Sequence, residues 1–589
     1  MGAFIVVKKN RNEHIEPALK LLREMGFCAP FTLDSGNWRV FSFSKFIGKE
    51  TNYVSGENIS IVAVGTPIYR GLGYNDTLKT LLEDYCRDRI QHDELCGQYT
   101  ILFCKTDSID VLCDSMFCKH IFVDMEREIF SSSMLAVSQG VEEKLHINRE
   151  AIYEKFLTGI IMAPNTLFSE VQQVDENIMS LVNAEHSGIH FIQKESIIEN
   201  APSKLSGKEK CVHEQTETLL QYFSKLENLS VDGIDMGLSG GYDSRLVLAC
   251  LIRSGIKNLH LHTHQTESDH KKDIVIAKTM ANYIGVPCNI VPSRHLCNCE
   301  DAEDIIRRSV LFFDGRTSFS IGGCGETYTA EYRRRATQDT PMTLTGVGGE
   351  LYRNVFSLGK KKYSWNAFID DKIASVDFKL CVSDELYKHI RSKVVNQIKA
   401  RLCSCNDEYV NLLLAQRYYC EIMMPDGQGN VVDAYNQISW CIAPFLERSI
   451  IHKGYEGITY HGSFGGFEGE MIDTLDHGLA SIKSSYGYPL NDRPLKNGLK
   501  EKARTFFSST SWRRIAGGKR KVLDSRKKAN FLSEIEANTT FQNEALIFLM
   551  KLFPEIDIIQ LALSEENGKS VLFMAATLYM FKEKIEYGI

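Results

Sequence analysis

The amino-acid sequence predicts an α/β protein built from two parts, and two stretches of its 589 residues carry that prediction. Between residues 234 and 289 the pattern is strand, glycine-containing turn, helix, strand, helix and strand, which is typical of a right-handed parallel unit. Before residue 195, short apolar strands alternate with turns. The sequence therefore predicts a parallel sheet with helices in the second part and a strand-rich, layered first part.

The parallel unit is predicted from the spacing of its apolar residues. Ile234, Met236 and Leu238 alternate as in a strand that enters a sheet. The apolar run after residue 244 ends at Gly255, as a short helix with a left-handed C-cap does. The pattern continues with strands at 259–263 and 288–291 and a helix at 271–285. Ligands of such sheets bind at the carboxyl ends of the strands, so the turn after Leu238 is the expected binding edge.

This turn carries groups that suit the phosphates of a nucleotide. Gly240 and Gly241 allow backbone N–H groups to approach an anion, and the following helix N-terminus adds positive potential. Ser239 and Ser244 supply hydroxyls. Asp243 is a carboxylate among these groups, which suits a Mg²⁺ that bridges to the phosphates. The turn has no lysine, so it is not a Walker A loop. The alternative, a tight turn with incidental serines, is disfavoured by the complete six-residue stretch between a strand and a helix.

Three stretches resemble the motifs of the asparagine synthetase family of ATP pyrophosphatases. Residues 239–244 read Ser-Gly-Gly-Tyr-Asp-Ser, which is similar to the family's Ser-Gly-Gly-x-Asp-Ser. Residues 345–350, Thr-Gly-Val-Gly-Gly-Glu, resemble Ser/Thr-Gly-x-Gly-Ala-Asp, and residues 444–447, Pro-Phe-Leu-Glu, resemble Pro-Phe-Leu-Asp. The resemblance implies a layered αββα glutaminase-like domain at 1–195. It also implies a parallel-sheet synthetase domain of the adenine-nucleotide α-hydrolase-like (PP-loop) type at 196–589.

The first part resembles the family's layered domain but lacks its nucleophile. The sequence predicts strands at 60–64, 99–103, 109–112, 118–123 and 128–131 and helices at 14–25 and 78–89. A working glutaminase of this type uses an N-terminal cysteine, whose amine and thiolate form the nucleophilic pair. Position 2 of this sequence is Gly2. The resemblance therefore implies a degenerate glutamine-amidotransferase-like domain that hydrolyses no glutamine.

The resemblance also assigns residues to a site for ATP and Mg²⁺. Main-chain groups of Leu238 and Thr263 are expected to hold the adenosine. Glu350 falls on the family's second Mg²⁺ carboxylate and Asp243 on the first, so both are expected metal ligands. The complete set of expected ATP contacts is Leu238, Ser239, Gly240, Gly241, Asp243, Ser244, Thr263, Thr345 and Gly346.

Two positions bear on how far the family's chemistry extends. Asparagine synthetases have Glu, and β-lactam synthetases have Tyr, where this chain has Val347. Valine transfers no proton, which argues against asparagine synthesis itself. Lys496 opens the stretch Lys-Asn-Gly-Leu-Lys-Glu, which is similar to the family's Lys-x-x-Leu-Arg-Glu. It is expected to stabilise charge on the α-phosphate or on the acyl intermediate, and the alternative is one lysine of a solvated helix start. The expected catalytic residues are therefore Asp243, Glu350 and Lys496.

Two stretches outside these motifs carry predictions of their own. Arg333, Arg334 and Arg335 close a helix-like run, either as a solvated helix end or as an anion-binding edge of the site. Residues 425–430, Pro-Asp-Gly-Gln-Gly-Asn, have the composition of a loop.

Composition limits the classes of function. A formal net charge of −7 argues against nucleic-acid binding, which needs a broad basic surface. The 17 cysteines are scattered and lack two pairs at zinc spacing, which favours reduced thiols and a cytoplasmic setting. No signal peptide is recognisable, and no uncharged apolar run approaches the roughly 18 residues of a membrane span.

These observations together favour an ATP-dependent ligase that forms an amide bond. A substrate carboxylate is adenylated with release of pyrophosphate, and an amine then displaces AMP, without glutamine hydrolysis. This resembles the β-lactam synthetases and the cyclases of lasso peptides. The expected partners are small-molecule or peptide carboxylates and amines, and a homo-oligomer or a biosynthetic partner protein is left open. Two alternatives remain: a PP-loop enzyme of another class that modifies nucleotides or tRNA, and a nucleotide-binding partner protein that no longer ligates.

Overall fold

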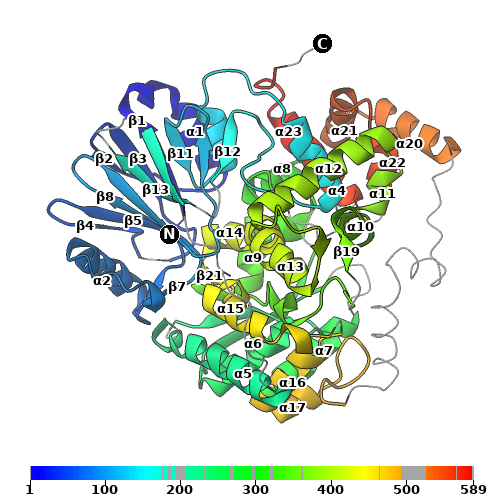
Figure 1. Ribbon diagram of the computed structural model, residues 1–589. Coiled ribbons are helices and arrows are strands. Elements are labelled where there is room, and N and C mark those ends of the chain that lie inside the picture. Colours follow the sequence, from blue (N-terminus) through cyan, green and yellow to red (C-terminus); the bar gives the residue numbers. More distant parts are fainter. Residues whose placement is uncertain are drawn as a thin grey trace.

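The computed structural model has an N-terminal part built on two antiparallel sheets and a C-terminal part built on one parallel sheet with many helices (Figure 1). It describes residues 2–48, 50–174, 178–183, 188–193, 207–229, 232–265, 271–294, 296, 299–317, 323–359, 362–462, 464–492, 525–564 and 567–586. The observed α/β class is the one predicted from the sequence. Lys496 lies outside the described residues, so its expected role stays a prediction.

The N-terminal part contains two six-stranded sheets with antiparallel pairing. The first sheet has the spatial order β12 (Val171–Gln173), β10 (Phe122–Asp124), β11 (Ile129–Ser131), β1 (Ala3–Lys8), β3 (Trp38–Phe43) and β2 (Phe31–Ser35). The second has the order β14 (Gly188–Gln193), β13 (Ile178–Asn183), β9 (Ile109–Cys113), β8 (Tyr99–Cys104), β5 (Ser60–Gly65) and β4 (Tyr53–Ser55).

The two sheets pack face to face. Alternate residues of each strand point to opposite sides, so one set lies between the sheets and the other faces a helical layer. Phe4 and Val6 of β1 are fully buried in the core between the sheets, together with Val62 of β5 and Leu102 of β8. Ile5, on the other face of β1, packs against the helical layer. That layer consists of α1 (Glu16–Glu24) and α3 (Met134–Gly140), and α2 (Tyr74–Cys86) covers the second sheet at β4 and β5. The layers are therefore α, β, β and α, as predicted.

The C-terminal part is organised around five parallel strands. Their spatial order is β17 (Cys288–Pro292), β16 (Leu259–Gln265), β15 (Ile234–Gly237), β18 (Met342–Leu344) and β21 (Trp440–Ile442). β18 and β21 are fully buried and β15 is nearly so, as is usual for parallel sheets, whereas β16 and β17 are partly exposed. The chain enters at β15, builds outward to β17 and then returns to β18 on the other side. The sheet thus has a switch point between β15 and β18, where the loops that follow the two strands diverge and leave room for a ligand.

Helices surround this sheet. α7 (Lys271–Ile284) and α9 (Ala330–Thr337) contact β16 and β17, and α14 (Gly429–Ile438) contacts β21. The other long helices are α4 (Arg149–Thr158), α5 (Lys208–Ser224), α6 (Asp243–Arg253), α8 (Ala302–Phe312), α12 (Asp384–Arg401), α15 (Arg448–Glu456), α16 (Gly466–Leu475), α20 (Ser525–Ala537), α21 (Phe541–Leu552) and α23 (Gly568–Met580).

Two predictions of local structure were wrong. The strand expected at 118–123 begins only at Phe122, because the Asp114 carboxylate accepts the backbone N–H groups of Met116, Cys118 and Lys119 and bends the chain into a turn. The loop expected at 425–430 lies instead in η9, a π-helix (Tyr418–Gln428), and in the start of α14. Its loop-like composition is overridden by tertiary contacts, since Asp426 is buried and pairs with Arg401.

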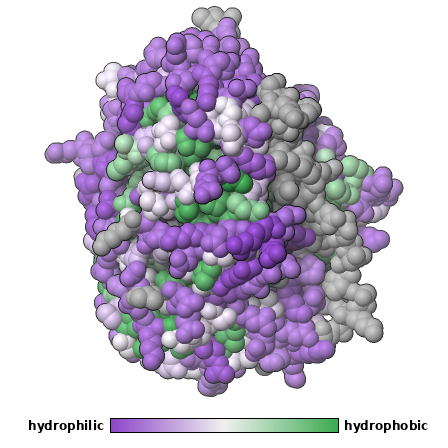
Figure 2. All heavy atoms as spheres, turned by 90° about the vertical axis from the view of Figure 1, so that its left-hand side faces the viewer, coloured by the Kyte–Doolittle hydropathy of each residue, from purple (hydrophilic) through white to green (hydrophobic). Residues whose placement is uncertain are grey.

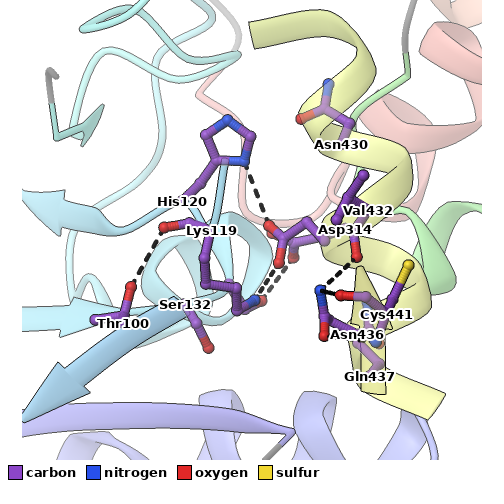
Figure 3. Close-up of polar contacts among 12 residues, drawn as sticks. Thr100, Lys119, His120, Ser132, Asp314, Asn430, Val432, Asn436, Gln437 and Cys441 are labelled. Atoms are coloured by element: carbon purple, nitrogen blue, oxygen red, sulfur yellow. Dashed lines mark hydrogen bonds and ion pairs between the residues drawn. The ribbon is translucent and has the colours of Figure 1, made fainter. Parts of the chain in front are cut away.

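A buried cluster of charges joins the two parts (Figure 3). Asp433 of α14 forms ion pairs with Lys119 of the N-terminal part and with Arg316, at 2.7 Å between carboxylate and guanidinium. His120 lies 3.4 Å from the same carboxylate. Burial alone would raise the pKa of Asp433, but the charges of Lys119 and Arg316 and the hydrogen bond from His120 lower it far below its ordinary value. This contact therefore consists of buried charges, and removal of any one of them would leave its partner charges buried and unpaired.

A second contact between the parts caps a helix. The buried carboxylate of Asp314, at the end of α8, accepts hydrogen bonds from the Ser133 hydroxyl and from the backbone N–H groups of Met134 and Leu135, at 2.6, 2.6 and 3.1 Å. These N–H groups open α3, so a residue of the C-terminal part satisfies donors that the helix itself leaves unpaired.

The surface that is visible and coloured in Figure 2 is mostly hydrophilic. Figure 2 shows hydrophobic side chains gathered in patches between broad hydrophilic areas on the side that the N-terminal part occupies in Figure 1. Among the described residues, no helix is both long and apolar enough to cross a bilayer.

Candidate nucleotide site

The loop at residues 239–242 leaves the sheet at the switch point and leads directly into α6. Ile234 and Met236 anchor β15 in the core, and the Leu238 N–H donates to the His262 carbonyl at 2.7 Å, which extends the pairing with β16 beyond the end of β15. α6 then begins at Asp243, with Leu246 fully buried on its inner face. Strand and helix are thus both fixed by packing, and the loop between them is held at the carboxyl edge of the sheet.

The two serines shape the loop from within. The Ser244 hydroxyl accepts the Ser239 N–H at 3.2 Å, and the two hydroxyl oxygens lie 3.1 Å apart. The Ser239 hydroxyl also accepts the Gly241 N–H at 3.3 Å. The structure therefore brings the two expected hydroxyls together, and they hold the loop closed.

Gly240 sits where a side chain would not fit. Its N–H donates to the Asp273 carboxylate of α7 at 3.0 Å, and its carbonyl accepts the Ser485 N–H at 2.9 Å. A Cβ at this position would lie 2.5 Å from the same Asp273 oxygen and 2.8 Å from the Ser485 Cβ. A Cβ on Gly241 would meet only the Ser239 hydroxyl, at 3.4 Å, so the Gly241 side of the loop is the less crowded one.

The second predicted loop, at residues 345–350, packs directly on the first. A Cβ on Gly346 would lie 2.9 Å from the Asp243 carbonyl carbon, and one on Gly349 would lie 2.2 Å from an Asp243 carboxylate oxygen. The Thr345 N–H donates to the Ile442 carbonyl at 3.0 Å, which ties this loop to β21. Thr345 and Gly346 are therefore adjacent to the first loop, as expected of residues that share one ligand with it.

A cluster of charged residues lies where the two loops meet. The Arg353 guanidinium forms ion pairs with Asp243 and with Glu468 of α16, the latter at 2.8 Å. Glu468 is fully buried, whereas Asp243 is about a quarter exposed (27%). Glu350 accepts a hydrogen bond from the Tyr419 hydroxyl at 2.8 Å. Three carboxyl groups and one guanidinium thus share this end of the sheet.

Their pKa values follow from burial and from their neighbours. Burial raises the pKa of Asp243 to about 6; the charge of Arg353 opposes this shift and that of Glu350 adds to it. Burial also raises the pKa of Glu468 well above its ordinary value, and the nearby Asp243 charge adds to the effect. Both carboxyl groups are therefore protonated more easily than free ones, because burial disfavours their charged forms.

The donor set fits Mg²⁺ only together with phosphate oxygens. Asp243 and Glu350 offer the carboxylate oxygens that Mg²⁺ prefers, and this ion is commonly bound by one or two carboxylates plus substrate phosphates. Within the described residues, no group of three or more His, Cys, Asp or Glu side chains is arranged to hold a metal by itself. Arg353 also competes for Asp243. Asp243 and Glu350 both lie at this end of the sheet, but the guanidinium already supplies positive charge to Asp243.

Thr263 lies in β16, next to a buried chain of polar contacts. His262 Nδ1 lies 2.8 Å from the Asp235 carboxylate, and His262 Nε2 is 3.3 Å from the Arg333 guanidinium. Arg333 is buried and stacks over Tyr435, so it is not the solvated helix end that was weighed for the three arginines. Arg334 and Arg335 are exposed and form ion pairs with acidic residues.

Some residues of the site were missed at the level of sequence. Arg353 follows Glu350 by three positions, and its nearness to the second motif was a usable signal. Glu468 and Tyr419 reach the site from helices far along the chain, where nothing in their local pattern points to it. Val347 lies in the second loop, and its N–H donates to the Thr345 hydroxyl at 3.3 Å. Its side chain adds no proton-transfer group.

Position 2 cannot accept a side chain without rearrangement. Gly2 is buried, and a Cβ there would lie 2.6 Å from the Ser44 carbonyl oxygen, 2.7 Å from that of Phe43 and 2.8 Å from the Phe27 ring. A cysteine at this position would clash with backbone on two sides.

No protein-family model and no curated protein matches the chain. Among solved structures, it matches the NMN synthetase from Francisella tularensis at 13% identity, over 24% of this chain and 57% of that chain, with a TM-score of 0.16. It matches glutamine phosphoribosylpyrophosphate amidotransferase from B. subtilis, complexed with ADP and GMP, at 11% identity over 49% and 66%, with a TM-score of 0.22.

A third match is the glutamine-dependent NAD⁺ synthetase from Acinetobacter baumannii in complex with ADP, at 14% identity over 60% of this chain and 76% of that chain, with a TM-score of 0.18. The chain spans less than two thirds of the length of the first two structures. Because all three TM-scores are low, the assignment of the site depends on the loops and the carboxylate cluster themselves.

Proposed function

We propose that the chain is an ATP-dependent ligase that adenylates a substrate carboxylate and transfers the acyl group to an amine. The observation that carries the proposal is the packing of loop 239–244 against loop 345–350 at the switch point of the parallel sheet. Backbone N–H groups at the start of α6 and the glycines before it suit a pyrophosphate, and nucleotides bind at this place in open α/β sheets.

The proposed reaction has two steps. A carboxylate oxygen attacks the α-phosphorus of ATP, the bond from that phosphorus to the oxygen bridging to the β-phosphate breaks, and pyrophosphate leaves with the electron pair. The amine nitrogen then attacks the acyl carbon, the bond from that carbon to the adenylate oxygen breaks, and AMP leaves while the nitrogen loses a proton. Suitable substrates are small-molecule or peptide carboxylates and amines.

Residues of this chain would act mainly by binding and by placing charge. The first loop would hold the β- and γ-phosphates, and Thr345 and Gly346 would contact the same nucleotide from the other side. Asp243 and Glu350 would hold Mg²⁺, which neutralises charge on the leaving pyrophosphate. Arg353 would contribute a second positive charge at this edge. The part of Lys496 in the reaction remains a prediction.

The amine is proposed to come from a substrate, because the N-terminal part offers no nucleophile at position 2 for releasing ammonia from glutamine. The crowded surroundings of Gly2 and the occupied domain contact around Asp433 support this. The N-terminal part then serves as a structural partner of the synthetase part.

A second candidate is a nucleotide-binding protein that no longer ligates. The ion pair between Arg353 and Asp243 favours it, since a paired carboxylate is less available to a metal. Val347 favours it as well, because it cannot transfer a proton.

The proposal is tested by incubating the chain with Mg-ATP and a panel of carboxylates and amines and by measuring the AMP and pyrophosphate that form. Asp243→Asn is expected to lower the rate at least about 100-fold, because the leaving group loses a metal ligand. Asp339→Asn is the matched control, since Asp339 lies on the surface and pairs with exposed Arg334. Full activity of Asp243→Asn would refute the metal assignment.

Two other outcomes would favour the alternative functions. ATP binding by calorimetry without AMP formation from any substrate would favour the non-ligating protein. AMP formation that depends on added tRNA would favour the nucleic-acid-modifying class.

A further inference from the structure

A cavity of about 780 Å³ lies between the two parts of the chain, apart from the nucleotide site. Its walls come from β7 (Leu95–Cys96) and from the segment that follows β9 on one side, and from α5 and α15 on the other. None of the residues that form the two nucleotide loops lines it. The volume falls within the roughly 300–1,000 Å³ of typical small-molecule sites.

Three basic side chains, of Lys225, Arg448 and Lys453, and two acidic ones, of Asp93 and Glu447, line this cavity. Lys225 and Lys453 have acidic neighbours, Glu94 at 3.7 Å and Glu214 at 2.9 Å. Arg448 and His452 line the cavity one helical turn apart on α15, and neither forms an ion pair with any residue that the structure describes. The Arg448 charge and the His452 ring nitrogens are therefore available to a ligand.

The one buried carboxyl group in the wall, that of Glu447, is engaged by hydrogen bonds from the protein. A single oxygen of Glu447 accepts the Gly97 N–H at 2.8 Å, the Gln98 amide at 3.1 Å and the Tyr222 hydroxyl at 3.1 Å. Burial raises the pKa of Glu447 to about 7. Because this carboxyl group is engaged by the protein, it opposes an anion in the cavity less than a free carboxylate would.

The remaining wall adds both apolar area and helix potential. Leu95, Tyr99 and Phe117 supply apolar and aromatic surface on the N-terminal side. α15 begins at Arg448, so the backbone N–H groups of its first turn, with the Ser449 hydroxyl, lie at the same wall as the Arg448 and His452 side chains. Positive charge at one wall and apolar surface at the other suit a ligand with an anionic head and a less polar body.

We propose that this cavity binds an anionic small molecule, through a phosphate or carboxylate group held by Arg448 and His452 at the start of α15. The site is independent of the nucleotide site and of the proposed ligase reaction. A ligand in it would contact both parts of the chain at once.

Isothermal titration calorimetry with inorganic phosphate and, separately, with citrate tests this site in the full chain. The variant Arg448→Ala/His452→Ala is expected to weaken binding at least about tenfold, because a guanidinium and an imidazole donor are lost. Both side chains are exposed, so the variant is expected to fold, and circular dichroism checks this. Lys388→Ala, at an exposed lysine of α12 outside the cavity, is the matched control and is expected to bind as the unaltered chain does.

The two anions distinguish the possible head groups. Binding of phosphate alone identifies a phosphoryl group, binding of citrate alone identifies a polycarboxylate, and either result supports the site if it depends on Arg448 and His452. Equal binding by the double variant and the unaltered chain would overturn the proposal, as would no heat from either anion up to about 10 mM. Binding that survives in the double variant but disappears in Asp243→Ala would place the anion at the nucleotide loops instead.

Discussion

At the scale of single residues, Arg353 determines the electrostatics of the nucleotide site. Without it, Asp243 and Glu468 would be two neighbouring acids with no nearby cation, and one of them is fully buried. Burial by itself lowers the pKa of Arg353, but the charges of Glu468, Asp243 and Glu350 outweigh this and raise it above its ordinary value. The guanidinium is therefore a permanent positive charge among groups that a metal is expected to share.

Arg353→Ala is expected to lower the free energy of unfolding by about 3 kcal/mol, because it leaves buried acids without a countercharge. Arg353→Lys keeps the charge but loses part of the forked contact, so a smaller loss is expected. Urea denaturation measures both. Arg334→Ala, at an exposed arginine of the same chain region, should change stability by no more than about 0.5 kcal/mol. Equal effects of the two alanine variants would contradict the role given to Arg353.

Gly349 sets how closely the two loops approach. Gly349→Ala is expected to displace the Asp243 carboxylate, since the new methyl group would lie 2.2 Å from one of its oxygens. If the proposed ligase reaction is correct, pyrophosphate release should fall more than about tenfold. Gly73→Ala is the control, because nothing lies within 4 Å of a Cβ there. Unchanged activity of Gly349→Ala would show that the loops need not be in contact for catalysis.

At the scale of elements, the sequence correctly predicted the helices and strands whose apolar residues recur with regular spacing. The parallel unit was correct to within about two residues, since strand residues such as Ile234 and helix residues such as Leu246 are buried through regular spacing. Residues 425–430 were misassigned because a proline and two glycines indicate a loop, while the buried pair of Asp426 with Arg401 holds them in a helix.

The candidate site was also predictable only in part, because some of its contacts depend on tertiary packing and not on the local sequence. The two loops carry short motifs, so their residues could be named from the sequence. Glu468 reaches Arg353 across 115 positions of sequence, and Tyr419 reaches Glu350 across 69. Such contacts are set by how the helices pack, and no pattern within α16 or η9 records them.

The cap on α3 gives a prediction for an element. Asp314→Ala is expected to cost about 3 kcal/mol of stability, because two backbone N–H groups and the Ser133 hydroxyl lose a buried acceptor. Thermal or chemical denaturation measures the loss. Asp304→Ala on the exposed side of α8 removes only a surface pair with Arg308 and should be nearly neutral. If the two variants were equally stable, the capping role would be wrong.

At the scale of the whole molecule, buried polar groups hold the N-terminal part on the C-terminal part. Besides the Asp433 cluster, Lys45 donates to main-chain and side-chain oxygens of Asn436 and to the Ser439 carbonyl, and Thr66 donates to the Asn436 side chain. Glu447 adds a third contact through Gly97. This extensive contact supports the structural role proposed for the N-terminal part.

Glu447 makes the stability of this contact depend on pH. Its pKa is raised by burial from 4.5 to about 7, so the folded chain binds its proton more tightly than the unfolded chain does. The free energy of unfolding should therefore fall as pH rises from about 4.5 through about 7, by at most about 3 kcal/mol. Glu447→Gln keeps an oxygen for all three donors and removes the titration.

This variant should accordingly match the unaltered chain at pH 5 and be more stable at pH 8, as measured by urea denaturation at both values. Glu408→Gln, at an exposed glutamate, should show no such difference. A Glu447→Gln variant that is less stable at pH 8 would indicate that the ionised carboxylate is needed in the folded chain.

The cap that Asp314 provides also has a consequence for how the protein is made. The helix that it caps begins 180 residues earlier, at Met134. A ribosome that adds about 5–20 residues per second needs roughly 10–40 s to reach Asp314 after Met134. From Gln193, the end of β14, until Asp314 is made, the nascent N-terminal layers are complete in sequence, but the start of α3 and the face around Lys119 still lack their partners. The newly made N-terminal part is therefore expected to remain a client of chaperones until the second half of the chain emerges.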